Sequence, residues 1–229
     1  MNNISFKVNN KNVNIYYKES IQKEIPVIIL NNFEDNGDIV YEKCQELEVS
    51  DFALVSITNI NWNDDLTPWK CKRLLKNDND YLGNADDYLK EIEKYIIPRI
   101  EKCIKEINKD IEYYALVGYS LAGLFSLYSS FNTSVFKRIG CISASFWYPN
   151  FVDFIKNNKI GESVSKVYFS LGNREKYSKI ELLSCVEDKT LEIYNYLNNK
   201  VDCIYEENIG NHFKDEELRI AKCIKWLLE

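Results

Sequence analysis

The 229-residue sequence contains a single histidine, His212, so a mechanism that needs an imidazole base has one candidate. It also lacks any C-x-x-C pair. Its seven cysteines are odd in number and widely spread, which argues against a disulfide framework and against a zinc site. We therefore expect the cysteines to be small buried hydrophobic residues in a reducing compartment.

Long apolar runs and basic runs are missing too. No stretch reaches the ~18 apolar residues of a membrane span, and the opening residues MNNISFKVNNKN lack the pattern of a signal peptide. We therefore expect a cytoplasmic protein with no membrane partner. Asp plus Glu number 35 against 29 for Lys plus Arg, a net charge of -6, which argues against a nucleic-acid partner. The abundance of Asn, Lys and Ile is typical of an AT-rich bacterial genome.

The composition itself is that of a globular protein, with 45% apolar and 28% charged residues. The sequence has no internal repeat, low-complexity tract or linker. A chain of this length can bury a full core as one unit, so we expect a single domain over residues 1–229.

Apolar runs and helical periodicity alternate along the chain. The runs predict strands over residues 4–8, 13–18, 26–30, 52–58, 113–117, 138–144, 166–171 and 201–205. The periodic segments predict helices over residues 38–48, 85–107, 121–131, 150–157, 187–197 and 215–228, with a kink at Pro98. We expect the first two strands to form an antiparallel hairpin and residues 59–79 to form a surface excursion. The alternation predicts an α/β protein with a mainly parallel sheet of about eight strands, covered by helices on both faces.

The segment from Gly118 to Gly123, GYSLAG, passes directly from a predicted strand into a predicted helix. This is the context of a nucleophile elbow, in which small residues two before and two after the serine let strand and helix approach closely. Gly118 and Ala122 occupy those positions around Ser120. The short pattern alone arises by chance in roughly one chain in ten of this length, as a turn before an ordinary helix, so its partners decide the interpretation.

A serine nucleophile needs a base, and His212 lies between the last predicted strand and the last helix, where an α/β-hydrolase sheet presents it. The acid should follow a strand between Ser120 and His212. Glu175 comes shortly after the strand over 166–171, so we predict it as the acid. Asp153, Asp188 and Asp202 are weaker candidates because they fall in predicted helices or in a strand.

An oxyanion hole requires two backbone N–H groups. Leu121, at the start of the helix, supplies one, and Asn32 or Phe33, in the loop after residues 26–30, supplies the other. Aromatic residues are the candidates to line the substrate cleft, although such a cluster is also typical of a core. They are Trp62, Trp69, Phe146, Trp147 and Tyr148.

The elbow, the segment Gly172-Asn173-Arg174-Glu175 and the segment Gly210-Asn211-His212-Phe213, in this order, resemble the esterase D-like ("putative esterase") branch of the α/β hydrolases. That branch includes siderophore trilactone esterases, S-formylglutathione hydrolases and feruloyl or acetyl-xylan esterases. The segment Asp65-Leu66-Thr67-Pro68 is similar to a D-x-T-P segment that lies near the active site there. The resemblance spans about residues 25–229.

By that resemblance Ser120, Glu175 and His212 are nucleophile, acid and base, and Asp65 and Tyr119 lie near the substrate. Two features depart from the family pattern: the acid is Glu where many relatives have Asp, and no arginine directly precedes Asp65. No metal or organic cofactor is implied, and we expect no large lid because the chain is compact in length.

The sequence therefore predicts a serine carboxylic-ester hydrolase that acts on a small or medium ester through an acyl-enzyme. A thioesterase or acyltransferase would use the same triad, and a non-catalytic binding module would retain the fold alone. The sequence leaves the substrate and the oligomeric state open.

Overall fold

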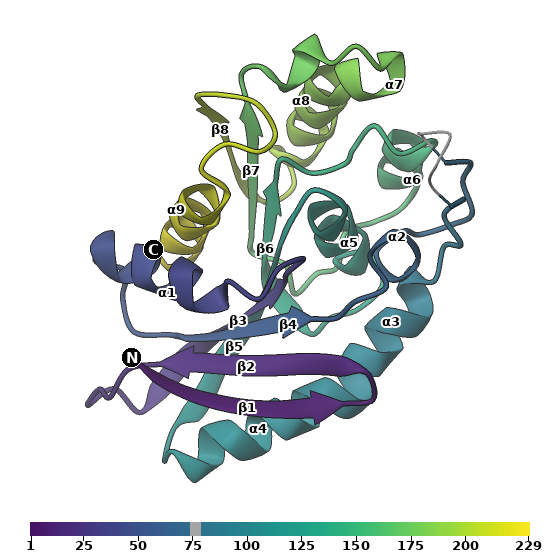
Figure 1. Ribbon diagram of the computed structural model, residues 1–229. Coiled ribbons are helices and arrows are strands. Elements are labelled where there is room, and N and C mark those ends of the chain that lie inside the picture. Colours follow the sequence, from purple (N-terminus) through teal and green to yellow (C-terminus); the bar gives the residue numbers. More distant parts are fainter. Residues whose placement is uncertain (74–78) are drawn as a thin grey trace.

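The protein is built around one eight-stranded sheet with the strand order β1-β2-β4-β3-β5-β6-β7-β8 (Figure 1). The computed structural model describes residues 1–73 and 79–229. The predicted surface excursion over 59–79 therefore lies partly outside the described residues. The strands are β1 (Asn2–Val8), β2 (Lys11–Tyr17), β3 (Glu24–Asn31), β4 (Ala53–Thr58), β5 (Asp110–Tyr119), β6 (Phe136–Ile142), β7 (Lys166–Gly172) and β8 (Asp202–Asn208).

Strand direction matches the prediction. β1 pairs with β2, and β2 with β4, in the antiparallel sense, whereas every pairing from β4 through β3 to β8 is parallel. The parallel strands therefore end at the same edge. In register, Asn31 of β3 lies beside Gly118 of β5, and Gly118 lies beside Cys141 of β6. The segments that follow these strands are brought together at this edge.

Helices cover both faces of the sheet (Figure 1). The main ones are α1 (Gly37–Glu46), α3 (Ala85–Glu91), α4 (Ile97–Glu106), α5 (Leu121–Ser129), α6 (Phe151–Asn157), α8 (Val186–Leu197) and α9 (Glu216–Leu228). α1 and α9 pack together on one face, where their apolar residues join those of the central strands in one buried cluster. The other helices bury the opposite face in a second cluster. The mainly parallel α/β architecture is thus confirmed.

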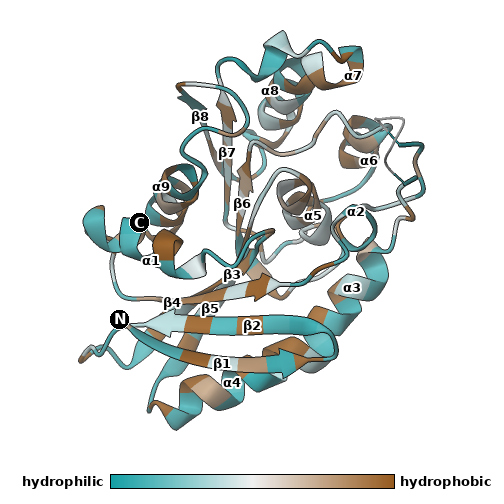
Figure 2. Ribbon diagram, in the orientation of Figure 1, coloured by the Kyte–Doolittle hydropathy of each residue, from teal (hydrophilic) through white to brown (hydrophobic). Residues whose placement is uncertain are grey.

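Helix amphipathicity accounts for this layering. Figure 2 shows hydrophobic and hydrophilic residues alternating along α4. Ile100, Cys103 and Ile104 are buried, whereas Glu101 and Lys102 between them are exposed. The three-to-four-residue spacing that predicted this helix is therefore the spacing of its buried face.

The predicted disturbance near Pro98 takes the form of a π-helical turn. The helix predicted over 85–107 consists of α3, the π turn η1 (Ile92–Ile96) and α4 in direct succession. Pro98 has no N–H to donate to the carbonyl four residues earlier, and the wider turn before it is typical of such a site. Three short elements were not predicted because three or four residues carry no periodicity: α2 (Trp62–Asp65), η2 (Glu175–Tyr177) and α7 (Glu181–Ser184).

Candidate active site

Ser120 stands at the turn between β5 and α5 with a backbone φ of 57° and ψ of -122°. This positive φ is strained for a residue with a Cβ, and such strain is concentrated at functional positions. The turn is held by hydrogen bonds on both sides, since the Ser120 N–H donates to the Ile142 carbonyl at 3.0 Å and the Ser120 carbonyl accepts from Ser145 at 3.0 Å. The turn thus has the backbone geometry of a nucleophile elbow.

The close approach of strand and helix explains the glycine two residues earlier. A Cβ on Gly118 would lie 2.2 Å from the carbonyl carbon of Ala122, a backbone atom that cannot move aside. Ala122 is itself fully buried. The small residues on which the sequence pattern depends are therefore required by this packing.

His212 lies in the loop between β8 and α9, and its Nδ1 lies 2.7 Å from Glu175 Oε2. An ionised carboxylate only accepts hydrogen bonds, so Nδ1 is the donor and carries the hydrogen. The imidazole side chain is 30% exposed, whereas the Glu175 side chain is 4% exposed. Because Nδ1 carries the hydrogen, Nε2 has the free lone pair that a general base needs.

Glu175 begins η2, just after β7, and its second oxygen is also fully engaged. Oε1 accepts hydrogen bonds from Ser143 Oγ at 2.7 Å and from the Gly172 N–H at 2.7 Å. Burial alone would raise the pKa of Glu175, but the hydrogen bonds and charge of His212, with those from Ser143 and Gly172, hold the pKa below its usual value. Glu175 is thus an ionised, oriented carboxylate behind the imidazole.

Ser120 and His212 both line two hollows that meet at the elbow. The first, which we call the aromatic hollow, has a volume of about 510 Å³ and carries Trp62, Tyr81, Trp147, Tyr177 and Phe213 among its lining residues. The second, of about 540 Å³, is more acidic, with Glu34, Asp215, Glu216 and Glu217 in its wall. An ester carbonyl placed at Ser120 would therefore have one part of the molecule in each hollow.

In the structure the Ser120 hydroxyl lies 3.3 Å from the hydroxyl of Ser145. Among the described residues no hydrogen bond joins Ser120 to His212, although both line the same hollows. Catalytic hydrogen bonds often tighten only when substrate binds, so this arrangement is compatible with a nucleophile and base pair.

The two candidates for the second oxyanion donor differ in their hydrogen bonding. The Asn32 N–H already donates to the Ile57 carbonyl at 2.9 Å, which removes it as a free donor. The Asn32 side chain bonds Asn36 at 2.6 Å. Phe33 follows directly, lines the acidic hollow with Ser120, and its ring meets Trp62 edge-on at 5.1 Å. The expectation that Asn32 supplies the second oxyanion N–H is therefore wrong, and Phe33 is the candidate that remains.

The predicted substrate residues divide into two groups. Trp62 and Trp147 line the aromatic hollow, and Tyr119 lines the acidic one. Asp65 and Trp69 do not line either hollow. Asp65 forms an ion pair of 2.5 Å with the buried Lys11, and Trp69 donates its indole N–H to the Pro149 carbonyl at 3.0 Å.

Phe146 and Tyr148, like Trp69, belong to the aromatic core instead of the hollow. Phe146 stacks on Phe151 with the ring centroids 5.6 Å apart, and Trp69 packs against Tyr148 at 6.0 Å. The structure therefore places these three side chains in the core, the alternative that the sequence left open for this aromatic cluster. Their pattern in the sequence cannot separate a core from a lining, because both favour large apolar side chains.

Sequence reasoning missed three polar residues around the triad candidates: Ser143, Ser145 and Arg219. Arg219 is only 1% exposed and lies 3.3 Å from Glu175 Oε1. It shares the buried face of α9 with Cys223 and Leu227, four and eight residues later. A charged residue at helical spacing on an otherwise apolar face was the signal that could have revealed it.

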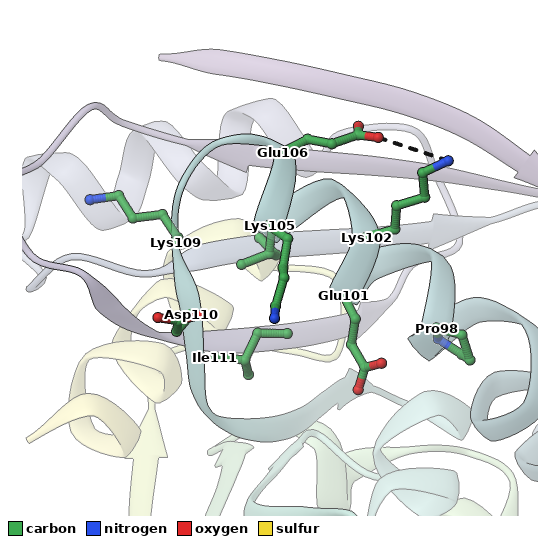
Figure 3. Close-up of a pocket in the computed structure, with 9 residues that line it drawn as sticks. Pro98, Glu101, Lys102, Lys105, Glu106, Lys109, Asp110 and Ile111 are labelled. Carbon is green, nitrogen blue, oxygen red and sulfur yellow. Dashed lines mark ion pairs between the residues drawn. The ribbon is translucent and has the colours of Figure 1, made fainter.

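A further hollow, of about 640 Å³, lies between α4 and the start of β5, at the opposite end of β5 from Ser120 (Figure 3). It is lined by charges of both signs, including the ion pair between Lys102 and Glu106. Serine, cysteine and histidine are absent from the described residues of its lining. This hollow therefore lacks the serine and histidine that the proposed triad requires.

Two further features of the described residues concern membranes and metals. Within residues 1–73 and 79–229, no helix has both the length and the apolar character needed to cross a bilayer. In the same residues, no three or more His, Cys, Asp or Glu side chains are grouped so that they could hold a metal ion.

Similarity to known proteins extends over most of the chain. A family model described as "Putative esterase" matches residues 7–206. "Uncharacterized protein YbbA" of Bacillus subtilis (strain 168) is 27% identical over 169 residues, which are 73% of this chain and 67% of YbbA.

Solved structures share the fold along almost the whole chain. Siderophore hydrolase EstA from Aspergillus nidulans has a TM-score of 0.73 and 19% identity, covering 99% of this chain and 92% of its own. An IroE-like serine hydrolase from Shewanella oneidensis has a TM-score of 0.76 and 17% identity, covering 99% of this chain and 79% of its own. At these identities the similarity establishes a common architecture.

Proposed function

Because the chain belongs to the "Putative esterase" family, we propose that it is a serine hydrolase that cleaves carboxylic esters through a Ser120–His212–Glu175 triad and an acyl-enzyme. The observation that carries the proposal is the 2.7 Å hydrogen bond between the chain's one histidine and Glu175, beside the strained Ser120.

In the first half-reaction, Ser120 Oγ attacks the ester carbonyl while His212 Nε2 takes the hydroxyl proton. Glu175 remains ionised and stabilises the imidazolium through the Nδ1 hydrogen bond. Breakdown of the tetrahedral intermediate breaks the bond to the alcohol oxygen, which takes the proton from His212. The products of this half are the free alcohol and an ester on Ser120.

In the second half-reaction, His212 removes a proton from water, whose oxygen attacks the ester on Ser120. The carboxylic acid leaves, and the proton returns to Ser120 Oγ. The enzyme is thus regenerated with one water consumed for each ester cleaved.

The backbone N–H groups of Leu121 and Phe33 stabilise the oxyanion in both halves. Leu121 is the first residue of α5, where the helix dipole and an unused N–H favour negative charge. Phe33 is the second donor because the Asn32 N–H is occupied by Ile57. Removal of one such donor in a serine hydrolase costs on the order of 10²-fold to 10³-fold in kcat.

We propose a small or medium neutral ester as substrate, because the hollows on either side of Ser120 have volumes of about 510 and 540 Å³. Phe33, Tyr177 and Phe213 are 69%, 74% and 80% exposed at their rim, which supports an open cleft suited to apolar or aromatic groups. A panel of aryl esters of increasing acyl length, lactones and thioesters would measure this preference.

A fluorophosphonate probe tests the proposal directly. We expect the parent protein to be labelled and to hydrolyse p-nitrophenyl acetate, and Ser120→Ala to lose both properties. Ser126→Ala is the matched control, because Ser126 lies in the same helix but bonds only the Ala122 carbonyl. Labelling or turnover that persists in Ser120→Ala would contradict the assigned nucleophile.

A further inference from the structure

Arg219 is a charged side chain in the interior of the protein. It lies in the first turns of α9, is 1% exposed, and is the largest of the fully buried side chains. A buried guanidinium is costly unless its hydrogens are used and an opposite charge is near. Its surroundings should therefore show what it stabilises.

One nitrogen of Arg219 faces the elbow and the acid. Nη1 donates to Tyr119 Oη at 3.0 Å, to Ser143 Oγ at 3.2 Å and to Glu175 Oε1 at 3.3 Å. Tyr119 directly precedes Ser120 in the chain. This nitrogen thus joins the elbow strand to the carboxylate behind His212.

The other nitrogen holds the loop that carries the base. Nη2 donates to the carbonyls of Ile209 and Asn211, at 3.3 Å and 3.0 Å. Tyr119 completes the connection, because its hydroxyl accepts from Arg219 and donates to the His212 carbonyl at 2.6 Å. Both sides of His212 are therefore tied to one guanidinium.

These groups are closely packed around Gly172. A Cβ on Gly172 would lie 2.5 Å from the Gly210 carbonyl oxygen, 2.9 Å from Glu175 Oε1 and 3.0 Å from Arg219 Nη1. Ser143, which links Arg219 to Glu175, has a strained φ of 45°. The cluster is packed against the backbone from both sides.

From these contacts we propose that Arg219 is a positioning residue of the triad, whose planar fork holds the acid, the base loop and the elbow strand at fixed distances. This inference rests on the proposed esterase function for its kinetic consequence alone. Lysine could supply the charge but not five directed contacts, because its ammonium is a compact group with three donors.

Charged and titratable groups from three elements interact with His212. They are Glu175 from η2, Tyr119 from β5, and Glu216 and Arg219 from α9. Removal of the guanidinium takes away a fixed positive charge, which makes protonation of the Glu175–His212 pair easier. The charge effect and the positioning effect can therefore be separated with two substitutions, Arg219→Met and Arg219→Lys.

Nuclear magnetic resonance of tag-free, ¹⁵N-labelled protein gives the decisive readout, because His212 is the one histidine and its Nδ1–H signal is unambiguous. In Arg219→Met we expect the pH midpoint of this signal to rise and its exchange with water to accelerate. In Arg219→Lys we expect the parent's midpoint but faster exchange. In both variants we expect kcat to fall about 10-fold to 100-fold with KM nearly unchanged.

Arg138→Met is the matched control. Arg138 also bonds α9, through the Leu227 carbonyl, but at the far end of the helix from His212. We expect this variant to keep the parent's midpoint, exchange rate and kcat. A merely structural role of Arg219 would lower stability without moving the midpoint.

A folded Arg219→Met protein with the parent's midpoint, exchange rate and kcat would overturn the inference. If Arg219→Met does not fold, the test depends on Arg219→Lys. In that variant, exchange of the His212 Nδ1 hydrogen with water as slow as in the parent would overturn the inference. If the parent itself neither hydrolyses esters nor reacts with the fluorophosphonate, the proposed function fails, while the resonance measurements still decide the positioning role.

Discussion

At the residue scale, Glu175 is the side chain whose surroundings say most about the site. It follows a parallel strand closely, is 4% exposed as a side chain, and accepts hydrogen bonds on both oxygens. A carboxylate at the protein surface would accept these hydrogen bonds from water. Here the protein itself supplies these hydrogen bonds, so Glu175 is a fixed negative charge whose second oxygen faces the imidazole.

Glu175→Gln should reduce kcat by on the order of 10³-fold to 10⁴-fold, because the amide neither stabilises the imidazolium nor enforces the required tautomer. Steady-state kinetics with p-nitrophenyl acetate measure this. Glu187→Gln is the control, since Glu187 pairs with Lys176 at 2.9 Å nearby but does not contact His212. If Glu175→Gln retained most of the activity, Glu175 would not be the acid of the triad, and another carboxylate would have to fill that role.

The lowered pKa of Glu175 also predicts how stability depends on pH. A carboxyl group with a folded-state pKa below its unfolded value stabilises the folded state above the unfolded value, and this contribution is lost as pH falls through the folded-state pKa. The difference in free energy of unfolding between the parent and Glu175→Gln should thus be greatest near neutral pH and shrink in acid. Urea titrations at several pH values measure it, and a difference that grows in acid would contradict the shift.

At the element scale, the junction of β5 and α5 is the feature on which the site is built. The strand ends at Tyr119 and the helix begins at Leu121, so Ser120 alone makes the turn. The carbonyl of Ser120 accepts hydrogen bonds from Gly123 and Leu124, which secures the first turn of α5. The strained residue is therefore held in place by regular structure on both sides.

Gly118→Ala tests this junction. The added Cβ would lie 2.2 Å from a backbone atom of Ala122, so strand and helix would have to separate. We expect a loss of about 3 kcal/mol in free energy of unfolding, measured by urea titration, and a loss of labelling at Ser120. Ser134→Ala, at an exposed position beyond α5, should change stability by less than about 0.5 kcal/mol. Equal stability of Gly118→Ala and the parent would contradict the packing.

At the scale of the whole molecule, the distribution of charge affects which ester reaches Ser120. The net charge is -6, and Glu34, Asp215, Glu216 and Glu217 line one of the two hollows. Burial, with repulsion from Glu217 and Glu34, raises the pKa of Glu216, which shows how closely these charges are gathered. The potential at the cleft should therefore oppose anionic substrates.

An aryl ester whose acyl group carries a carboxylate should have a kcat/KM about 10-fold below that of an uncharged ester of the same length at low salt. The ratio should narrow in about 0.5 M salt, because salt screens these charges. It should also narrow in Glu34→Gln but not in Glu93→Gln, a control on η1. An unchanged ratio in Glu34→Gln would show that the wall does not select by charge.

The sequence by itself determined the architecture. Eight strands and the main helices were predicted near their observed positions, because apolar periodicity reports which face of each element is buried. The antiparallel hairpin and the order of Ser120, Glu175 and His212 along the chain follow from the same local information. The strained elbow at Ser120 was also predictable, because its small flanking residues are a local requirement.

Only the tertiary structure decided what depends on contacts between distant segments. It placed Glu175 against His212, 37 residues away, and showed that the Asn32 N–H is already used. It showed that Asp65 and Trp69, which were expected near the substrate, instead form an ion pair with Lys11 and a hydrogen bond to the Pro149 carbonyl. It also brought Arg219 to Tyr119 across 100 residues of chain. Local pattern reports how deeply a residue is buried, whereas the partner of a buried polar group is set by how the elements pack.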